Sequence, residues 1–223
     1  PRSTLFPYTT LFRSLWRKRA LSHIDILPGM RVLDIGAGTG ELTFKVAKRL
    51  GSTGEVVGLD PCDTMLENAQ NKLERFSFPR DSSDLAIRFV KGRGEELPFD
   101  SETFDVVVTS FAVRNMTDMY KGLHEVFRVL ISGGNFMILD MCKPASNLFG
   151  SLYRWYLRNI IGFIATLCLG ERERSSYLES SILQFLTPEE LCDILREKGF
   201  TEIHYYPIFF DIIGVYTGKK PSL

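Results

Sequence analysis

The sequence shows no excess of charge of either sign. Its 223 residues include 27 Lys and Arg residues and 27 Asp and Glu residues, which gives a formal net charge of +0 at pH 7. Proteins that bind nucleic acids depend on clustered positive charge, so we expect no nucleic-acid partner. The chain is 44% hydrophobic and 24% charged, which is typical of a soluble globular protein, and its length suits one α/β domain better than two.

Cysteine and histidine are scarce and scattered. The four cysteines are Cys62, Cys142, Cys168 and Cys192, and the three histidines are His23, His124 and His204. No C-x-x-C pair and no Cys/His cluster occurs, although structural zinc sites need such spacing. We therefore expect no metal site, and reduced thiols in a cytoplasmic protein. None of the isolated histidines is assigned as a general base.

Apolar runs long enough to cross a membrane are absent from the sequence. The most apolar stretch, Leu148–Leu169, is interrupted by two arginines and an asparagine, and the remaining run Ile160–Leu169 is too short to span a bilayer. Three interpretations stay open: a helical cap over a greasy substrate, a membrane-surface segment, or an ordinary buried helix. We assign residues 145–182 as an inserted apolar substrate cap. Peripheral contact with a membrane and a homodimer are kept as expectations.

The first 14 residues differ in character from the rest. Residues 4–14 match the in-frame translation of a common DNA-sequencing library adaptor, so we expect residues 1–14 to be a non-native, adaptor-derived leader. The gene would then be truncated at that junction. The alternative is a basic, aromatic presequence, because the segment carries arginine and lacks acids. We expect residues 15–220 to form a single domain.

Hydrophobic periodicity alternates along the chain between the strand pattern and the helix pattern. The expected strands cover residues 31–35, 55–59, 86–90, 104–109, 135–141, 203–210 and 212–217, and the expected helices cover residues 41–50, 62–76, 117–130 and 187–198. Such alternation predicts βαβ crossovers and an α/β fold with a mostly parallel sheet and helices on both faces. The last two strands are expected at one sheet edge.

A glycine-rich turn, within the segment Val32–Gly40, lies between the first expected strand and helix. Gly36, Gly38 and Gly40 allow positive φ and a close approach of backbone to a ligand, and the amides that begin the helix suit a carboxylate. A dinucleotide turn would need a third glycine at position 41, where Glu41 is poorly placed beside a pyrophosphate. The spacing therefore favours a cofactor with an amino-acid tail.

Asp60 supplies a second anchor for such a cofactor. It ends the second expected strand, where an acid can accept hydrogen bonds from both ribose hydroxyls. A strand-terminal Asp is often only a helix cap. Together with the glycine turn that precedes it, however, Asp60 indicates a nucleoside ligand.

From Leu15 to Lys220 the sequence resembles the class I methyltransferases that depend on S-adenosylmethionine, and within them the ubiquinone/menaquinone C-methyltransferase family. The matching segments are residues 15–19 (LWRKR), 32–40 (VLDIGAGTG), 57–60 (VGLD), 96–99 (ELPF), 110–118 (SFAVRNMTD), 125–130 (EVFRVL), 132–134 (SGG), 143–144 (KP) and 177–182 (YLESSI). The glycine motif and the LPF segment are shared by many methyltransferases. The Arg114-Asn115 pair and the YLxxSI segment are more specific to the quinone branch.

The resemblance implies a Rossmann-like sheet of seven strands with the last strand antiparallel. It implies that Thr39 and the glycines hold the methionine part of S-adenosylmethionine, that Asp60 holds the ribose, and that Ser110 lies against the sulfonium end. Asp34 is placed with these cofactor-binding residues, and Arg93-Gly94 on the adenine side.

Some positions depart from the family pattern. The family usually has Asp-Ala or Asn-Ala at Arg93-Gly94, and an arginine side chain can donate to adenine but cannot accept from its amino group. Ser175 replaces a usual aromatic residue, and Tyr216 replaces a usual histidine. The family's segment upstream of Leu15, which covers cofactor and substrate, is not present in this sequence.

The implied reaction is C-methylation of a polyprenylated, demethylmenaquinol-like hydroquinone ring. Arg114 is the candidate that favours the phenolate, because its guanidinium keeps its proton; the alternative is a salt bridge to Asp118. Asn115 either orients the substrate or caps the helix that starts near Thr117. Tyr177 either lines the pocket or belongs to the core.

Two other functions stay open. One is a methyltransferase for another lipophilic small molecule, such as a sterol or a phospholipid headgroup. The other is a truncated protein that binds S-adenosylmethionine without catalysis, which the replacement at Arg93 and the segment missing before Leu15 motivate.

Overall fold

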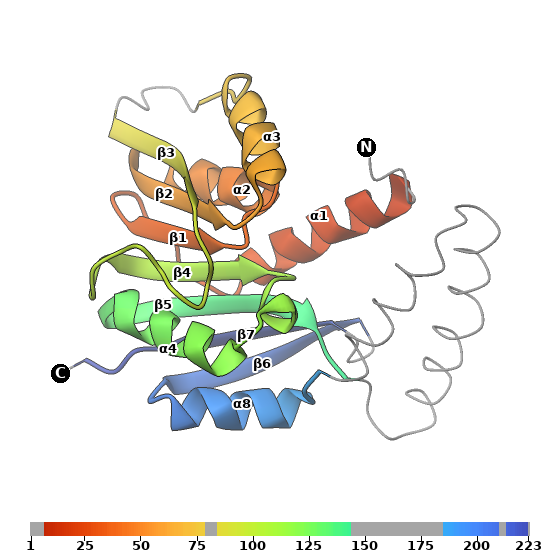
Figure 1. The fold of residues 1–223 in the computed structure, drawn as a ribbon, viewed down its shortest axis with the longest axis vertical. Helices are drawn as coiled ribbons and strands as arrows, with labels where there is room; N and C mark the ends of the chain where they lie inside the picture. Colours follow the sequence, from red (N-terminus) through yellow and green to blue (C-terminus); the bar gives the residue numbers. More distant parts are fainter. Residues whose placement is uncertain (1–6, 79–83, 144–184, 210–212, 223) are drawn as a thin grey trace.

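The centre of the fold is a seven-stranded sheet, seen in a computed structural model that describes residues 7–78, 84–143, 185–209 and 213–222 (Figure 1). Its strands are β1 (Arg31–Ile35), β2 (Thr53–Asp60), β3 (Asp84–Lys91), β4 (Phe104–Ser110), β5 (Leu130–Met141), β6 (Thr201–Phe209) and β7 (Ile213–Lys219). They lie in the order β3-β2-β1-β4-β5-β7-β6. Strands β1 to β5 pair in parallel and β7 runs antiparallel to β5 and β6, which confirms the Rossmann-like sheet expected from the sequence.

Helices cover both faces of this sheet. They are α1 (Pro7–Leu21), α2 (Glu41–Leu50), α3 (Asp63–Leu73), the 3-10 helix η1 (Val113–Asn115), α4 (Met119–Val129) and α8 (Pro188–Glu197). Buried residues of α1 and α2 pack on one face, and those of α4 and α8 pack on the other. Helix α1 begins at Pro7, inside the segment 1–14 that was set aside as a leader.

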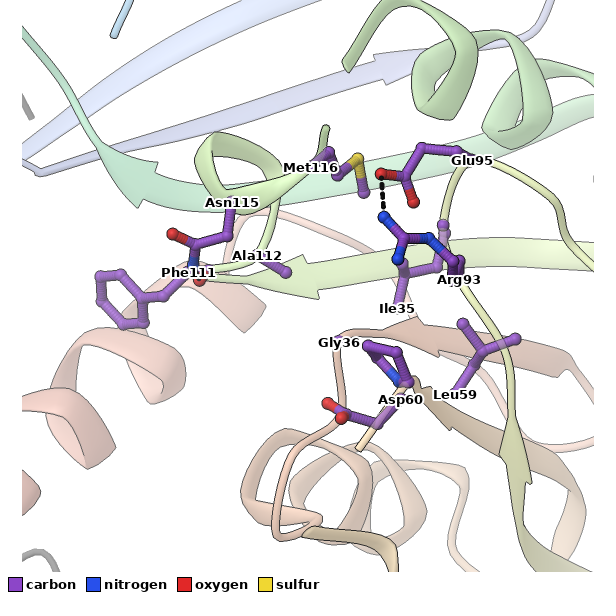
Figure 2. A pocket seen from close by; sticks show the side chains of 12 residues that line it. Ile35, Gly36, Leu59, Asp60, Arg93, Glu95, Phe111, Ala112, Asn115 and Met116 are labelled. Carbon is purple, nitrogen blue, oxygen red and sulfur yellow. Dashed lines mark hydrogen bonds and ion pairs between the residues drawn. The ribbon is translucent and has the colours of Figure 1, made fainter. Parts of the chain in front are cut away.

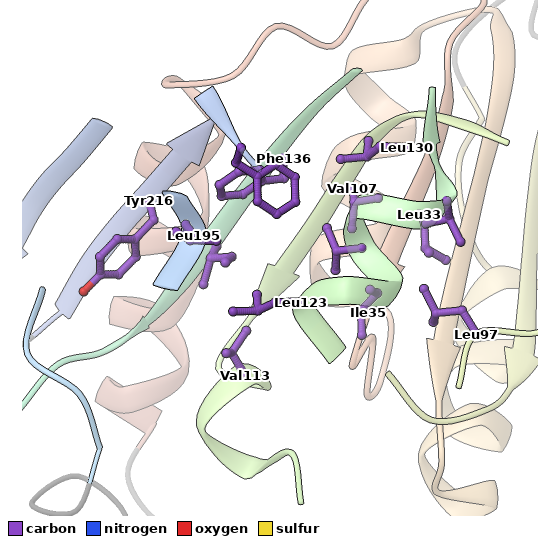
Figure 3. Close-up of a cluster of buried hydrophobic side chains, with 14 of the residues drawn as sticks. Leu33, Ile35, Leu97, Val107, Val113, Leu123, Leu130, Phe136, Leu195 and Tyr216 are labelled. Carbon is purple, nitrogen blue, oxygen red and sulfur yellow. The ribbon is translucent and has the colours of Figure 1, made fainter. Parts of the chain in front are cut away.

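Strand β4 shows how the sequence produces a sheet buried on both faces. Its side chains alternate, so that Val106 and Val108 join the cluster under α1 and α2. Val107 joins the cluster under α4 and α8, where it is labelled in Figure 3. All three are at most 1% exposed. Because a strand places successive side chains on opposite faces, a continuous run of valines fits only between two layers.

The ends of two helices test the expectations drawn from capping residues. Thr187 and Glu190 form a capping box, in which Thr187 N donates to Glu190 Oε2 at 2.8 Å, so the expected start of α8 is confirmed. The prediction that a helix begins at Thr117 is wrong. Asp118 accepts a hydrogen bond from Lys121 N at 2.9 Å and is the N-cap of α4, and η1 precedes it.

The sheet order fixes where a ligand can bind. Strand β1 leads to β2 on one side, whereas β4, its other neighbour, leads to β5 on the opposite side. At such a switch point the loops diverge and leave a crevice at the carboxyl ends of the strands. The glycine turn follows β1 and the segment Phe111–Thr117 follows β4, so both face this crevice.

Candidate active site

A cavity of about 330 Å³ occupies the crevice between the carboxyl ends of β1, β2 and β4 (Figure 2). Its lining residues are Ile35, Gly36, Leu59, Asp60, Pro61, Arg93, Gly94, Glu95, Phe111, Ala112, Asn115 and Met116. Five of the residues selected from the sequence are therefore brought together here. These are Gly36, Asp60, Arg93, Gly94 and Asn115.

The glycine turn needs its glycines for two different reasons. Gly36, Gly38 and Gly40 have φ values of 73°, 54° and 79°, in the left-handed region that side chains with a Cβ rarely adopt. At Gly36 a Cβ would also lie 2.4 Å from Ala112 Cβ. A glycine at position 36 therefore allows the turn after β1 to approach the segment after β4 closely.

Asp60 braces the glycine turn from the end of β2. Its Oδ2 accepts a hydrogen bond from Gly38 N at 2.8 Å, and its Oδ1 accepts one from Cys62 N at 2.9 Å. Each carboxylate oxygen has a second lone pair, so the side chain can still accept from hydroxyl groups. A ribose fits this arrangement, because the carboxylate is fixed on two sides and lines the cavity.

Asp34 lies in β1 beneath the turn, and it does not line the cavity. Its Oδ2 accepts a hydrogen bond from Thr43 Oγ1 at 2.6 Å, while its Oδ1 is buried and meets no donor among the described residues. Burial raises the pKa of Asp34 to about 6, although the Thr43 hydroxyl and the nearby Arg17 act in the opposite direction. A buried carboxylate with one unpartnered oxygen suits a cationic group, such as the ammonium of an amino-acid tail.

The hydroxyls of Thr39 and Ser110 are both engaged by basic side chains. Lys72 Nζ donates to Thr39 Oγ1 at 3.0 Å, and Arg17 Nε donates to Ser110 Oγ at 3.0 Å. Helix α1 therefore reaches the end of β4, where the sulfonium end was expected. Burial lowers the pKa of Arg17, and the carboxylate of Asp34 opposes this shift.

The Arg93 side chain donates hydrogen bonds to neighbouring side chains and cannot act as an acceptor. Its Nη2 donates to Thr117 Oγ1 at 3.0 Å and to Glu95 Oε1 at 3.3 Å, the contact drawn in Figure 2. Its side chain is 61% exposed, whereas that of Glu95 is only 11% exposed. Glu95 also lines the cavity, next to Arg93 and Gly94, which were expected on the adenine side.

The Arg114 guanidinium is held by Asp140, and the salt bridge to Asp118 considered from the sequence is wrong. Arg114 Nη1 lies 2.5 Å from Asp140 Oδ1, and both side chains are buried. Asp118 serves as the N-cap of α4 instead. The pairing of residues four apart applies within a continuous α-helix, and Arg114 lies in η1, before α4 begins.

Asn115 lines the cavity and also fixes the turn at the end of β4. Its Nδ2 donates to the carbonyl oxygen of Phe111 at 3.0 Å. Phe111 has a φ of 61°, which costs free energy in a residue with a bulky side chain. The alternative role of Asn115 as helix cap is wrong, because Asp118 occupies that position.

A second cavity of about 400 Å³ lies on the other side of η1. It is lined by Val113, Arg114, Met116, Thr117, Asp118, Met119, Tyr120, Phe185 and Leu186. The 3-10 helix thus forms a wall between two spaces, with Asn115 facing the first cavity, Arg114 facing the second and Met116 lining both. Two ligands bound in these two cavities would therefore lie close to each other.

Sequence reasoning missed three residues of this region: Arg17, Glu95 and Asp140. Asp140 offered a signal, because like Asp60 it lies near the carboxyl end of a parallel strand. Tyr177, Ser175 and the cap assigned to residues 145–182 lie outside the described residues. Across residues 7–78, 84–143, 185–209 and 213–222, no helix is both long and apolar enough to cross a bilayer.

The sequence matches a known family along nearly its whole length. The model of the family described as the ubiE/COQ5 methyltransferase family matches residues 10–220. The chain is 34% identical over 207 residues to the ubiquinone/menaquinone biosynthesis C-methyltransferase UbiE of Idiomarina loihiensis, covering 92% of this chain and 80% of that protein. It is also 34% identical over 205 residues to the demethylmenaquinone methyltransferase of Deinococcus radiodurans, covering 92% and 81%.

Solved structures agree on the fold. The YcgJ protein of Bacillus superposes with a TM-score of 0.65 at 17% identity, covering 94% of this chain and 99% of that one. A methyltransferase of Thermotoga maritima that depends on S-adenosylmethionine gives a TM-score of 0.63 at 19% identity, covering 94% and 89%. At these identities the likeness concerns the fold alone.

Proposed function

The chain belongs to the ubiE/COQ5 methyltransferase family, and from this membership we propose that it methylates a ring carbon of a demethylmenaquinol-like hydroquinone that carries a polyprenyl chain. It is an S-adenosylmethionine-dependent methyltransferase. The observation that carries the proposed acceptor is the family match over residues 10–220, with relatives named for demethylmenaquinone and ubiquinone/menaquinone methylation. The two cavities that meet at η1 support a reaction between a cofactor and a second ligand.

The first cavity is assigned to the cofactor. Asp60 would hold the ribose hydroxyls, and the amides at the start of α2 would face the methionine carboxylate. Asp34, which lies beneath the turn and whose buried Oδ1 meets no described donor, would attract the methionine ammonium through its negative charge. On the adenine side the acceptor for the amino group would be Glu95, because the Arg93 guanidinium can only donate hydrogen bonds.

The second cavity is assigned to the aromatic acceptor. Bound S-adenosylmethionine supplies an electrophilic methyl group on a positively charged sulfur. The protein must align the acceptor ring with that group and exclude water. The guanidinium of Arg114 carries a positive charge, so it favours the ionised hydroxyl that increases electron density at the neighbouring ring carbon. Methyl transfer would form a C–C bond at the ring carbon and break the S–C bond of the cofactor, and the proton that the ring carbon loses would pass to water.

We also propose that the protein works in the cytoplasm at a membrane surface. A polyprenyl chain keeps its ring in a bilayer, so the acceptor must be reached there. Cosedimentation of the purified chain with anionic vesicles, with and without short-chain quinol, measures this contact. Equal recovery in the supernatant at all lipid concentrations would contradict it.

The acceptor assignment is tested by following the methyl group. The purified chain is incubated with S-adenosylmethionine labelled with ¹³C in the methyl group and with a short-chain demethylmenaquinol kept reduced. We expect one label on a ring carbon, located by NMR of the product. The variant Asp60→Ala is the control, which should lose both the calorimetric heat of cofactor binding and the transfer. Label found only on oxygen, or on a sterol or phospholipid headgroup instead of the quinol, would refute the proposal.

A further inference from the structure

One acidic residue next to η1, the wall between the two cavities, has no role in the function proposed so far. Asp140, at the end of β5, is fully buried, and it accepts hydrogen bonds from Arg114 Nη1 at 2.5 Å and from Met141 N at 2.8 Å. It also accepts from the backbone N–H of Arg114 at 3.2 Å. The carboxylate therefore holds the main chain and the side chain of the same residue, and it joins η1 to the sheet.

The positive charges near Arg114 explain why its guanidinium needs the contact with Asp140 to keep its position. The Arg114 guanidinium carbon lies 5.9 Å from the centre of the Phe111 ring, and the guanidinium carbons of Arg13 and Arg17 lie 5.4 and 5.8 Å from the same ring. Three like charges around one side chain repel each other. An arginine in the wall of a cavity would move away from the other two unless an acid retained it.

Stability alone does not account for a buried ion pair at this place. Taking two charges out of water costs about as much free energy as their attraction returns, so such pairs contribute little to folding on balance. The Arg114 side chain is 7% exposed, and its Nε is buried with no acceptor among the described residues. A donor that is fixed and yet unpartnered beside a cavity is suited to a ligand oxygen.

We propose that Asp140 is a positioning residue, which fixes the Arg114 guanidinium in the wall between the two cavities and leaves its Nε–H for the ionised hydroxyl oxygen of the acceptor. The inference rests on the proposed function for the nature of the acceptor. The fixing of Arg114 by Asp140 is independent of it. Two separate measurements therefore address the two parts.

The first measurement needs no substrate. In the full chain labelled with ¹⁵N-arginine, a fixed and buried Arg114 gives an Nε–H resonance that exchanges slowly with water, assigned by its loss in Arg114→Lys. Asp140→Asn should speed this exchange at least tenfold, whereas Asp140→Glu, which keeps the charge, should retain part of the protection. The control Glu125→Gln breaks an ion pair with Arg128 outside both cavities and should leave the resonance unchanged. Unchanged exchange in Asp140→Asn would overturn the positioning role.

The second measurement is methyl transfer to the short-chain demethylmenaquinol. We expect Asp140→Asn to lower kcat about 100-fold, within the range found when a preorganised donor is removed, while KM for S-adenosylmethionine stays within threefold. Arg114→Gln should lower kcat equally, and the double variant should lower it no further. Independent, multiplying losses would show that Asp140 acts as a structural acid only. If the wild type methylates no quinol but keeps the slow resonance, the proposed acceptor fails, and with it the role of Nε, while the fixing of Arg114 stands.

Discussion

Thr43 donates a hydrogen bond of 2.6 Å to Asp34 Oδ2, and the other oxygen of that carboxylate is buried without a donor among the described residues. The protein therefore holds a partly satisfied acid beneath its glycine turn. Such a group destabilises the folded chain whenever it is ionised, unless a cation arrives.

Replacing Asp34 by Asn should change how stability depends on pH. Burial raises the pKa of Asp34 from 3.8 to about 6, so between these values the folded chain keeps a proton that the unfolded chain has lost. The free energy of unfolding of the wild type therefore falls as pH rises through this window, by at most about 3 kcal/mol from this group. Asp34→Asn lacks this fall. Denaturant unfolding at pH 4, 5, 6 and 7 measures the difference between the two proteins.

The same variant should bind S-adenosylmethionine about tenfold more weakly at pH 7.5, because it removes the charge proposed to pair with the ammonium. Calorimetry measures the affinity. A difference in unfolding free energy that stays constant from pH 4 to 7 would show that Asp34 has no raised pKa, whatever the affinity.

Gly36→Ala should abolish cofactor binding and destabilise the fold. The new Cβ would lie 2.4 Å from Ala112 Cβ, in addition to the strain of φ 73°. Gly29→Ala is the matched control, because Gly29 has φ 86° with nothing within 4 Å of a built Cβ, and its strain alone should cost about 1–2 kcal/mol. Thermal and denaturant unfolding compare the two variants. The double variant Gly36→Ala/Ala112→Gly should recover part of the loss, and no recovery would show that the close approach to Ala112 is not the cause.

Arg93→Ala should leave the affinity for S-adenosylmethionine within about threefold. Its side chain is 61% exposed and donates hydrogen bonds to Glu95 and Thr117, and exposed ion pairs contribute at most about 1 kcal/mol. Glu95→Ala should weaken binding more than tenfold, since Glu95 lines the cavity and also accepts from Thr117 N at 2.8 Å. Calorimetry on both variants checks the order of the two effects, and a larger loss in Arg93→Ala would reverse the assignment of the adenine side.

Tyr216→Phe should affect stability and not turnover. The Tyr216 hydroxyl lies 3.1 Å from Cys142 Sγ, both residues are fully buried, and burial raises the pKa of the phenol, so it stays neutral. Loss of one buried hydrogen bond should cost about 0.5–1.5 kcal/mol of unfolding free energy. Methyl transfer should stay within twofold of the wild type. A large fall in kcat would instead place position 216 in the acceptor site.

The meeting of Gly36 and Asp60 at one cavity could be predicted because both positions follow from the order of the elements along the chain. Gly36, Gly38 and Gly40 lie in one turn, and Asp60 ends the next strand, so the order of strand, turn, helix and strand already places them together. Parallel strands carry their carboxyl ends to one edge, and this rule needs no knowledge of tertiary contacts.

The side-chain contacts of Arg114 and Ser110 could not be predicted in the same way. Arg114 and Asp140 are 26 residues apart and meet only because β4 and β5 pair along their length, whereas Asp118, the nearer acid in sequence, caps a helix. Arg17 and Ser110 are 93 residues apart. Contacts of this kind depend on how α1 and η1 pack on the sheet, which hydrophobic periodicity does not specify.

Met116 has a consequence for the range of acceptors. Its Cε lies 2.6 Å from where a Cβ on Gly94 would stand, and its Sδ lies 2.5 Å from a Cβ built on Gly122, so two glycines make the slot that holds it. Met116 lines both the cavity of about 330 Å³ and the cavity of about 400 Å³. Because an unbranched methionine changes rotamer at little cost, the space that it leaves to each cavity is adjustable. A substitution of this one hydrophobic side chain would therefore enlarge one cavity at the expense of the other, without altering the hydrogen bonds of the residues assigned to either ligand.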